Sequence, residues 1–249
     1  MPRAGLNRER IAQQAATVAD QTGLDQLTLA AVAARCGVSL PGLYKHIDGV
    51  DAVKRDIAVL AVRELTAELA QATAGLAGRD ALIALSRAYR SYARAHPGRY
   101  AASVRAPDRG DDEHAAAGAA AVGLVATVLK GYRIEGTDMI DAVRILRAAL
   151  HGFVSMEAAG GFGLPQSVDA TFTRMIDALH TAWTTWDTAG QTSLERLTPP
   201  GSDIPTQPGQ PRVPRNGIVQ MFDSSAGRSA GGWGDPPGSR APGHASPSV

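Results

Sequence analysis

The feature that most constrains the fold is a short stretch, residues 28–46, whose small and turn-forming residues stand at fixed distances from one another. Ala33 is followed four positions later by Gly37, and Leu43 stands six positions after that glycine. A small residue lets two helices cross closely, and glycine adopts the left-handed backbone at a helix end at low steric cost. The spacing is typical of a helix-turn-helix.

The residue types at the predicted helix ends agree with this interpretation. Thr28 has the hydroxyl needed to cap the first short helix, and Ser39 has the one needed to cap the second. Pro41 is tolerated in the first turn of the second helix. Leu43 and Ile47 are then expected to turn inward. The alternative is that the stretch is simply two packed helices.

The second helix is the predicted recognition helix, whose N-terminal half would enter the major groove of DNA. Leu40, Gly42 and Lys45 are expected to point outward, and Tyr44 and His46 are placed for contacts with the DNA backbone. Lys45 is the only charged side chain among them. Each phosphate that is neutralised adds to affinity, and a dimer would double the footprint, which fits the small charge of one recognition helix.

The rest of the sequence predicts an all-α fold. Helical spacings run through residues 7–188, strand-type alternation is missing, and aromatic residues make up only 5%. We expect a three-helix helix-turn-helix domain over residues 1–56 and a helical bundle for ligand binding and dimerisation over 57–188. Ten of the 15 prolines lie in residues 190–249, so residues 189–249 are expected to be a disordered tail.

Several helices of the second domain can be placed from their spacing. Asp80 is expected to cap a helix that stops at Pro97, and helices are expected near 115–130, 137–159 and 168–187. Helix 137–159 has one narrow polar stripe, which predicts that most of it is enclosed. The last helix has an apolar stripe with two tryptophans. These two helices form either a dimer face or the core of one subunit.

The N-terminal 60 residues resemble the TetR family of bacterial repressors, in the Leu-Thr helix, the Gly-Val-Ser turn and the Leu-Tyr-x-His of residues 43–46. Residues 148–162 resemble the core of a C-terminal domain found in part of that family. The resemblance implies an all-helical homodimer with a small-molecule pocket, a dimer bundle made by the last two long helices, and release from operator DNA on ligand binding. By position it implies DNA contacts from Thr28, Ser39, Pro41, Gly42, Tyr44, Lys45 and His46.

One departure from the family pattern concerns the phosphate contact at the start of the next helix. Many relatives have a lysine where this chain has Val50. Lys54 and Arg55, one turn further on, are candidates to compensate, and Lys54 is included among the predicted DNA contacts. Arg3, Arg8 and Arg10 either add backbone contacts or form a solvated arm.

Candidate ligand contacts in the second domain are aromatic, apolar or polar side chains of its predicted helices. His151 lies on the polar stripe of helix 137–159 and either hydrogen-bonds a ligand or is a satisfied core or interface histidine. The predicted set comprises Tyr89, Tyr92, Tyr132, His151, Phe153 and Met156. Plain core packing is the alternative for each of them.

Other kinds of chemistry find little support in the sequence. There is no phosphate-binding glycine loop, no nucleophile elbow and no His or Cys cluster, so we expect no enzyme, no cofactor and no metal. Cys36 is alone, the first residues are polar, and the uncharged stretch 115–129 is shorter than a membrane span, so we expect a cytoplasmic protein without membrane contact. The predicted function is a DNA-binding regulator, a repressor released by a small molecule. The alternative is a helical protein-interaction module without sequence-specific DNA binding.

Overall fold

The computed structural model describes residues 6–186, and this part of the chain is helical with no strand. This confirms the predicted all-α class. The predicted tail, residues 189–249, and Arg3 lie outside the described residues. The helices are α1 (Arg8–Thr22), α2 (Leu29–Cys36), α3 (Leu40–Leu43), α4 (Val50–Thr73), α5 (Gly78–Ala95), α6 (Pro97–Ser103), α7 (Asp112–Leu129), the 3-10 turn η1 (Lys130–Tyr132), α8 (Gly136–Ala158) and α9 (Val168–Thr184).

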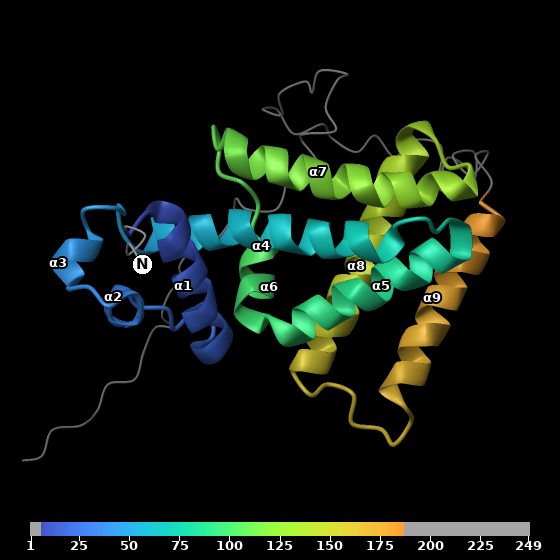
Figure 1. The fold of residues 1–249 in the computed structure, drawn as a ribbon. Helices are drawn as coiled ribbons and strands as arrows, with labels where there is room; N and C mark the ends of the chain where they lie inside the picture. The colour runs from blue at the N-terminus through green and yellow to red at the C-terminus, as the bar shows by residue number, and fades with distance from the viewer. Residues whose placement is uncertain (1–5, 187–249) are drawn as a thin grey trace, which may run out of the picture.

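Helices α1–α3 and the first turns of α4 form a small bundle at one end of the molecule, here called the N-terminal head (Figure 1). Its core joins Ile11 of α1, Val32 of α2, Leu43 of α3 and Ile57 of α4, all at most 1% exposed. α4 continues from this core into the rest of the molecule without a break, across the predicted boundary at residues 56 and 57.

The rest of α4 and helices α5–α9 form the second unit, here called the helical domain (Figure 1). Its core takes Leu82 from α5, Leu129 from α7 and Leu146 from α8. Trp183 of α9 is 1% exposed and belongs to the same core. The apolar stripe of the last helix therefore packs on the core of its own chain.

Three details of the helical domain differ from the sequence predictions. Asp80 does not cap α5, because the helix begins at Gly78 after Ala77 and makes no side-chain cap hydrogen bond. The Pro97–Gly98 pair does not only stop a helix: it also starts α6, since proline is well suited to the first helical turn. Helix α8 is not mostly enclosed within one chain, because Ile145 and Met156 are 40% and 51% exposed.

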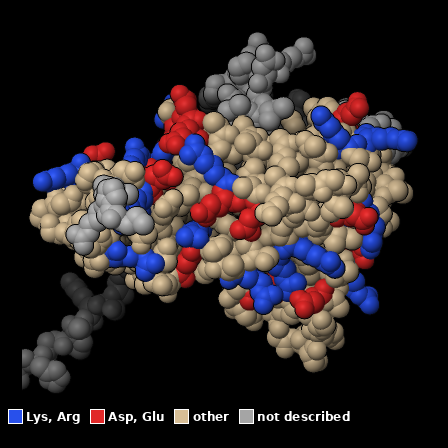
Figure 2. All heavy atoms as spheres, in the orientation of Figure 1, with Lys and Arg blue, Asp and Glu red and all other residues tan. Residues whose placement is uncertain are grey.

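Helix α7 is the most apolar helix of the described chain. By length and hydropathy alone, Asp112–Tyr132 is sufficient to cross a membrane, and 28% of this segment's most apolar part is buried inside the fold. The segment is longer than the uncharged stretch 115–129 on which the sequence prediction rests. In the fold, α7 packs along α4 and α8, and its Val122 and Leu129 belong to the core of the helical domain. Figure 2 shows how few charged side chains lie over its outer face.

Candidate nucleic-acid interface and helical-domain cavity

The turn between α2 and α3 has the local geometry predicted from its residues. The Thr28 hydroxyl accepts a hydrogen bond from the Ala31 amide at 3.2 Å, and the Ser39 hydroxyl accepts one from the Gly42 amide at 3.3 Å. Gly37 ends α2 in the left-handed conformation, with φ of 69°. These caps satisfy backbone groups that the two helix ends would otherwise leave unpaired.

The face of α3 that packs inward and the face that remains exposed are clearly separated. Leu43 is fully buried and Ile47 is 6% exposed, as predicted. Leu40 and Tyr44 are 38% and 55% exposed. α3 itself is only one turn long, and residues 44–46 continue it as turns. Ser39, Pro41, Lys45 and His46 are exposed and Gly42 is half-buried, so the predicted contact residues of this stretch lie together on one corner of the head.

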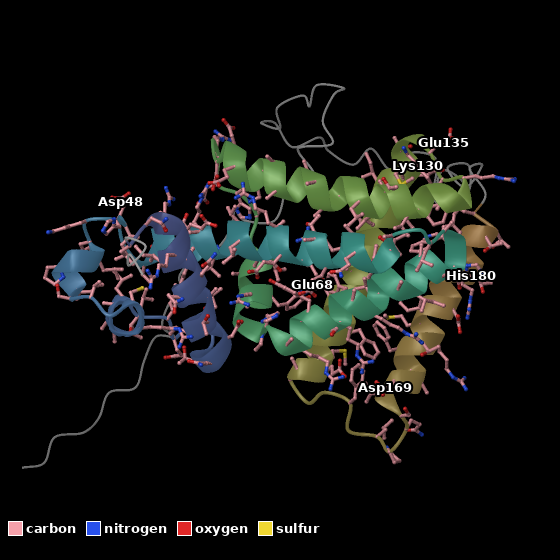
Figure 3. The ribbon with its side chains drawn as sticks, viewed as in Figure 1. Asp48, Glu68, Lys130, Glu135, Asp169 and His180 are labelled. Atoms are coloured by element: carbon pink, nitrogen blue, oxygen red, sulfur yellow. The ribbon has the colours of Figure 1, made fainter. Side chains whose placement is uncertain are left out.

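Basic side chains near this corner are few. Figure 2 shows Lys and Arg side chains at the end of the molecule formed by α2 and α3, without a continuous basic patch. Lys54 of α4 is half-buried. Asp48, labelled in Figure 3, is in the loop just before α4 and is exposed. The head therefore carries a light positive charge in its recognition segment.

Arg55, a candidate to compensate for the missing lysine at position 50, is held by carboxylates in this structure. Its guanidinium donates to both carboxylate oxygens of Asp111, to Glu113 at 2.7 Å and to Asp56 at 3.1 Å. The hydrogen bonds from Arg55 to Asp111 lower the pKa of that carboxyl group to about 2. Arg8 is also paired, with Asp56 at 2.6 Å. The two arginines thus join α1, α4 and the start of α7, which explains why Arg55 is not directed to a phosphate.

The helical domain contains a largely apolar cavity between α4, α5, α7 and α8, with a volume of about 110 Å³. Its apolar wall includes Leu69, Leu85, Val122 and Leu150. The loop after α6 closes one side with Val104 and Pro107. Sequence reasoning did not identify the polar members of the wall, which are Ser103, Arg105, His114 and Arg147, because they come from separate elements.

Of the six predicted ligand contacts, only Tyr89 lines the cavity. Tyr92 is 1% exposed, and its hydroxyl donates to the Ala61 carbonyl and to Glu64. The Tyr132 hydroxyl bonds His180 of α9, which is labelled in Figure 3. The three remaining residues also lie outside the wall: His151 bonds Tyr100, Phe153 packs on Phe162 and Phe172, and Met156 is exposed.

A chain of hydrogen bonds runs from the cavity to α8. The Tyr89 hydroxyl is 3.0 Å from the Tyr100 hydroxyl, which is 2.6 Å from Nδ1 of His151. Burial raises the pKa of both tyrosines and lowers the pKa of His151, and the nearby charge of Arg147 lowers that histidine pKa further. All three groups are therefore neutral near pH 7. The hydrogen bonds between them link α5, α6 and α8 through uncharged side chains.

Helix α6 connects this region to the N-terminal head. A Cβ atom placed on Gly98 would lie 2.1 Å from the carbonyl carbon of Ala19, so only glycine allows the two backbones this close. The next amide, that of Arg99, donates to the Asp20 carboxylate at 2.9 Å. The other end of α6 carries Ser103, which lines the cavity. One short helix thus contacts both α1 and the cavity wall.

Arg90 fastens three helices of the domain to one another. Its guanidinium lies 4.8 Å from the ring centre of Phe172 and 5.4 Å from that of Phe153. It also pairs with Glu157 at 2.5 Å and with Asp169 at 2.7 Å. Asp169 is labelled at the start of α9 in Figure 3. The cluster joins α5 to α8 and α9 through both charge and ring contacts.

Comparisons with known proteins agree with this architecture. Residues 82–179 match the family described as Tetracyclin repressor-like, C-terminal domain. The chain is 38% identical over 174 residues to Rv0681 of Mycobacterium tuberculosis, an uncharacterized HTH-type transcriptional regulator, in a match that covers 70% of this chain and 79% of the other.

Solved structures share the fold. A protein of unknown function from Rhodococcus sp. RHA1 superposes with a TM-score of 0.62 at 26% identity, over 73% of this chain and 98% of that one. BioQ, solved with its double-stranded DNA operator, superposes with a TM-score of 0.52 at 18% identity, over 71% of this chain and 99% of the other. The sequence matches and the capped helix-turn-helix together show that the chain belongs to the TetR family of DNA-binding transcriptional regulators.

Proposed function

We propose that this protein is a homodimeric repressor that binds operator DNA through its N-terminal head and leaves it when a small molecule fills the helical-domain cavity. The position of α6 supports this most strongly, because its Gly98 end packs on the α1 backbone and its Ser103 end lines the cavity. A ligand that displaces the wall would act on a helix in contact with the head. That ligand must bind the DNA-incompetent form more tightly than the DNA-competent one. Because the target is operator DNA, we also propose a cytoplasmic location.

The proposed DNA-reading surface is the exposed corner around α3. Leu40 and Tyr44 offer exposed apolar and aromatic contacts, and Lys45 offers a phosphate contact. At Gly42, the lack of a side chain favours close approach of the backbone to DNA. The full proposed set is Thr28, Ser39, Leu40, Pro41, Gly42, Tyr44, Lys45, His46 and Lys54.

Dimerisation through α8 and α9 is part of the proposal. α8 exposes Ile145 and Met156, and between them the small residues Ala148 and Gly152. An exposed apolar and small-residue face is suited to close packing of helices, here into a four-helix bundle with the same helices of a second copy. A dimer would present two heads to the DNA, and the doubled footprint would compensate for the small positive charge of each head.

The dimer proposal is tested by light scattering coupled to size exclusion. Ile145→Glu is expected to give a monomer, because the charge would be buried in the interface. Ala120→Glu, at an exposed position of α7, is the matched control and is expected to remain a dimer. A dimeric Ile145→Glu protein would show that α8 is not the interface.

The DNA proposal is tested by fluorescence anisotropy with the DNA upstream of the protein's own gene and with a shuffled duplex of the same composition. We expect binding that prefers the upstream DNA and weakens steeply as salt rises from 50 to 200 mM, about 10³-fold or more for a dimer that contacts six phosphates. Binding that is absent, or that ignores both salt and sequence, would contradict the proposal and support a protein-interaction module.

A further inference from the structure

The wall of the helical-domain cavity consists mostly of aliphatic side chains from four helices. Leu65 comes from α4, Leu85 from α5, Val122 and Val125 from α7, and Leu150 from α8. Aliphatic groups make no hydrogen bonds to a ligand, and they gain free energy when apolar surface replaces water against them. Most of the wall therefore favours an apolar ligand surface.

The hydroxyl groups of the wall are already hydrogen-bonded within the protein. The Tyr89 hydroxyl is 3.0 Å from the Tyr100 hydroxyl, and the Ser103 hydroxyl donates to the backbone carbonyl of Tyr100 at 2.8 Å. Burial raises the pKa of Tyr89, so its hydroxyl is neutral near pH 7. Neither hydroxyl needs a ligand to satisfy its hydrogen bonding.

The basic groups of the wall are also compensated. His114 is 4% exposed, and its Nδ1 lies 4.0 Å from a carboxylate oxygen of Asp111. Burial lowers the pKa of His114, and the carboxylates of Asp111 and Asp108 oppose this effect. Arg147 interacts with another group of the protein, and Arg105 is exposed to solvent. Carboxylates, other protein groups or water thus balance the positive charges of this wall.

Such a wall discriminates against a charged ligand. An ion entering the cavity would lose its hydration shell, and an apolar wall whose polar groups already have partners would not replace it. An uncharged apolar molecule loses little on leaving water and gains from burial. Size sets a further limit, since a cavity of about 150 Å³ holds benzene, and this one has about 110 Å³.

We propose that the effector is an uncharged, largely apolar molecule no larger than about one substituted aromatic ring. It lies among the aliphatic residues of α4, α5, α7 and α8, and the loop after α6 covers it with Val104 and Pro107. This inference rests on the proposed function only in taking the cavity as the effector site.

Calorimetric titration of the full-length protein tests the ligand class without using DNA. The three probes share one ring: toluene is neutral, benzoate is an anion and benzylamine is a cation near pH 7. We expect toluene to bind at least about 10-fold more tightly than either ion, because only the ions lose a strong hydration shell. Binding of an ion as tight as that of toluene, or no binding of toluene, would overturn the proposal.

Two neighbouring alanines of α7 localise the binding. Ala121 lines the cavity, whereas Ala120 is exposed and outside the wall. Ala121→Leu fills part of the cavity and is expected to lower toluene affinity at least about 10-fold. Ala120→Leu is the matched control and is expected to bind as the wild type does. Equal affinity of the two folded variants would overturn the assignment to this cavity.

Enlarging the cavity gives a second test, which decides the matter if thermal melting shows that Ala121→Leu is unfolded. Leu65→Ala removes aliphatic volume from the α4 part of the wall. We expect this variant to bind indole, which has two fused rings, more tightly relative to toluene than the wild type does. An unchanged ratio of the two affinities would overturn the assignment.

A separate DNA-release assay distinguishes this inference from the proposed function. If toluene binds in the cavity but the upstream DNA remains bound, ligand-induced release is wrong while the ligand class holds. If toluene does not bind and a charged compound releases the DNA, the ligand class is wrong while ligand-induced release holds.

Discussion

Replacing Gly98 with alanine is the most informative perturbation of the link between the cavity and the head. The new Cβ would lie 2.1 Å from the carbonyl carbon of Ala19, 2.2 Å from its oxygen and 2.5 Å from the Asp20 nitrogen. All three are backbone atoms of α1, so no side chain can rotate away. Because ordinary contact begins at 3.4 Å, α6 and α1 must separate by more than an ångström.

The cost of that separation can be estimated from overpacked cores, where added methyl groups typically cost about 1–3 kcal/mol. A collision with backbone atoms belongs at the upper end, so we expect Gly98→Ala to lower the free energy of unfolding by about 3 kcal/mol. For a domain of this size, that corresponds to a fall in Tm of roughly 6–12 °C. The separation would also strain the hydrogen bond between the Arg99 amide and Asp20.

Urea denaturation followed by circular dichroism, at one fixed protein concentration, measures this change. The control is Gly123→Ala in α7, where an added Cβ meets no atom within 4 Å. Because alanine is a better helix former than glycine, the free energy of unfolding of this variant is expected to rise by about 0.5–1 kcal/mol. The packing argument for α6 fails if Gly98→Ala unfolds within about 0.5 kcal/mol of the wild type, the usual range for a neutral surface change.

Two further predictions concern ion pairs. Arg90→Ala is expected to lower the free energy of unfolding, measured by urea denaturation, by about 3 kcal/mol, because it leaves Glu157 without its partner. Arg94→Ala, at an exposed position, is the control and is expected to change the free energy of unfolding by no more than about 0.5 kcal/mol. Equal effects of the two variants would contradict the role of Arg90. Asp111→Asn keeps a side chain able to cap α7 but removes the pair with Arg55. Since the pKa of Asp111 in the folded protein is lowered to about 2, its ion pair with Arg55 stabilises the folded state above pH 4. That stabilisation is lost as the pH falls toward 2. The stability difference between wild type and variant should therefore shrink over that interval, and a constant difference would contradict the argument.

Local chemistry explains why the helix-turn-helix could be predicted from the sequence. The Thr28 and Ser39 caps join residues three positions apart, and Gly37 shapes the turn through its own backbone. Such interactions depend on neighbours in the chain, so residue type and spacing are enough to find them. The helices of residues 112–129 and 136–158 were also near their predicted places, because apolar spacing reports helical faces directly.

The cavity was harder to predict because its wall combines residues from distant elements. Residue type alone makes Tyr92 and Tyr132 candidates for ligand contact, but long-range hydrogen bonds to Glu64 and His180 hold them away from the cavity. The sequence makes Arg55 a candidate for a phosphate contact, and its ion pair with Asp111 becomes visible only in the fold. Partners so far apart in the chain leave no periodic signal in a single sequence.

The role of residues 39–46 in reading DNA is tested most directly by comparing the wild type with Tyr44→Phe and Lys45→Ala on the upstream DNA. We expect both variants to remain dimers and to bind more weakly. Lys45→Ala should also lower the slope of log affinity against log salt by about two, one phosphate contact for each head. If both variants bind with wild-type affinity and salt slope, the corner around α3 is not the DNA-reading surface.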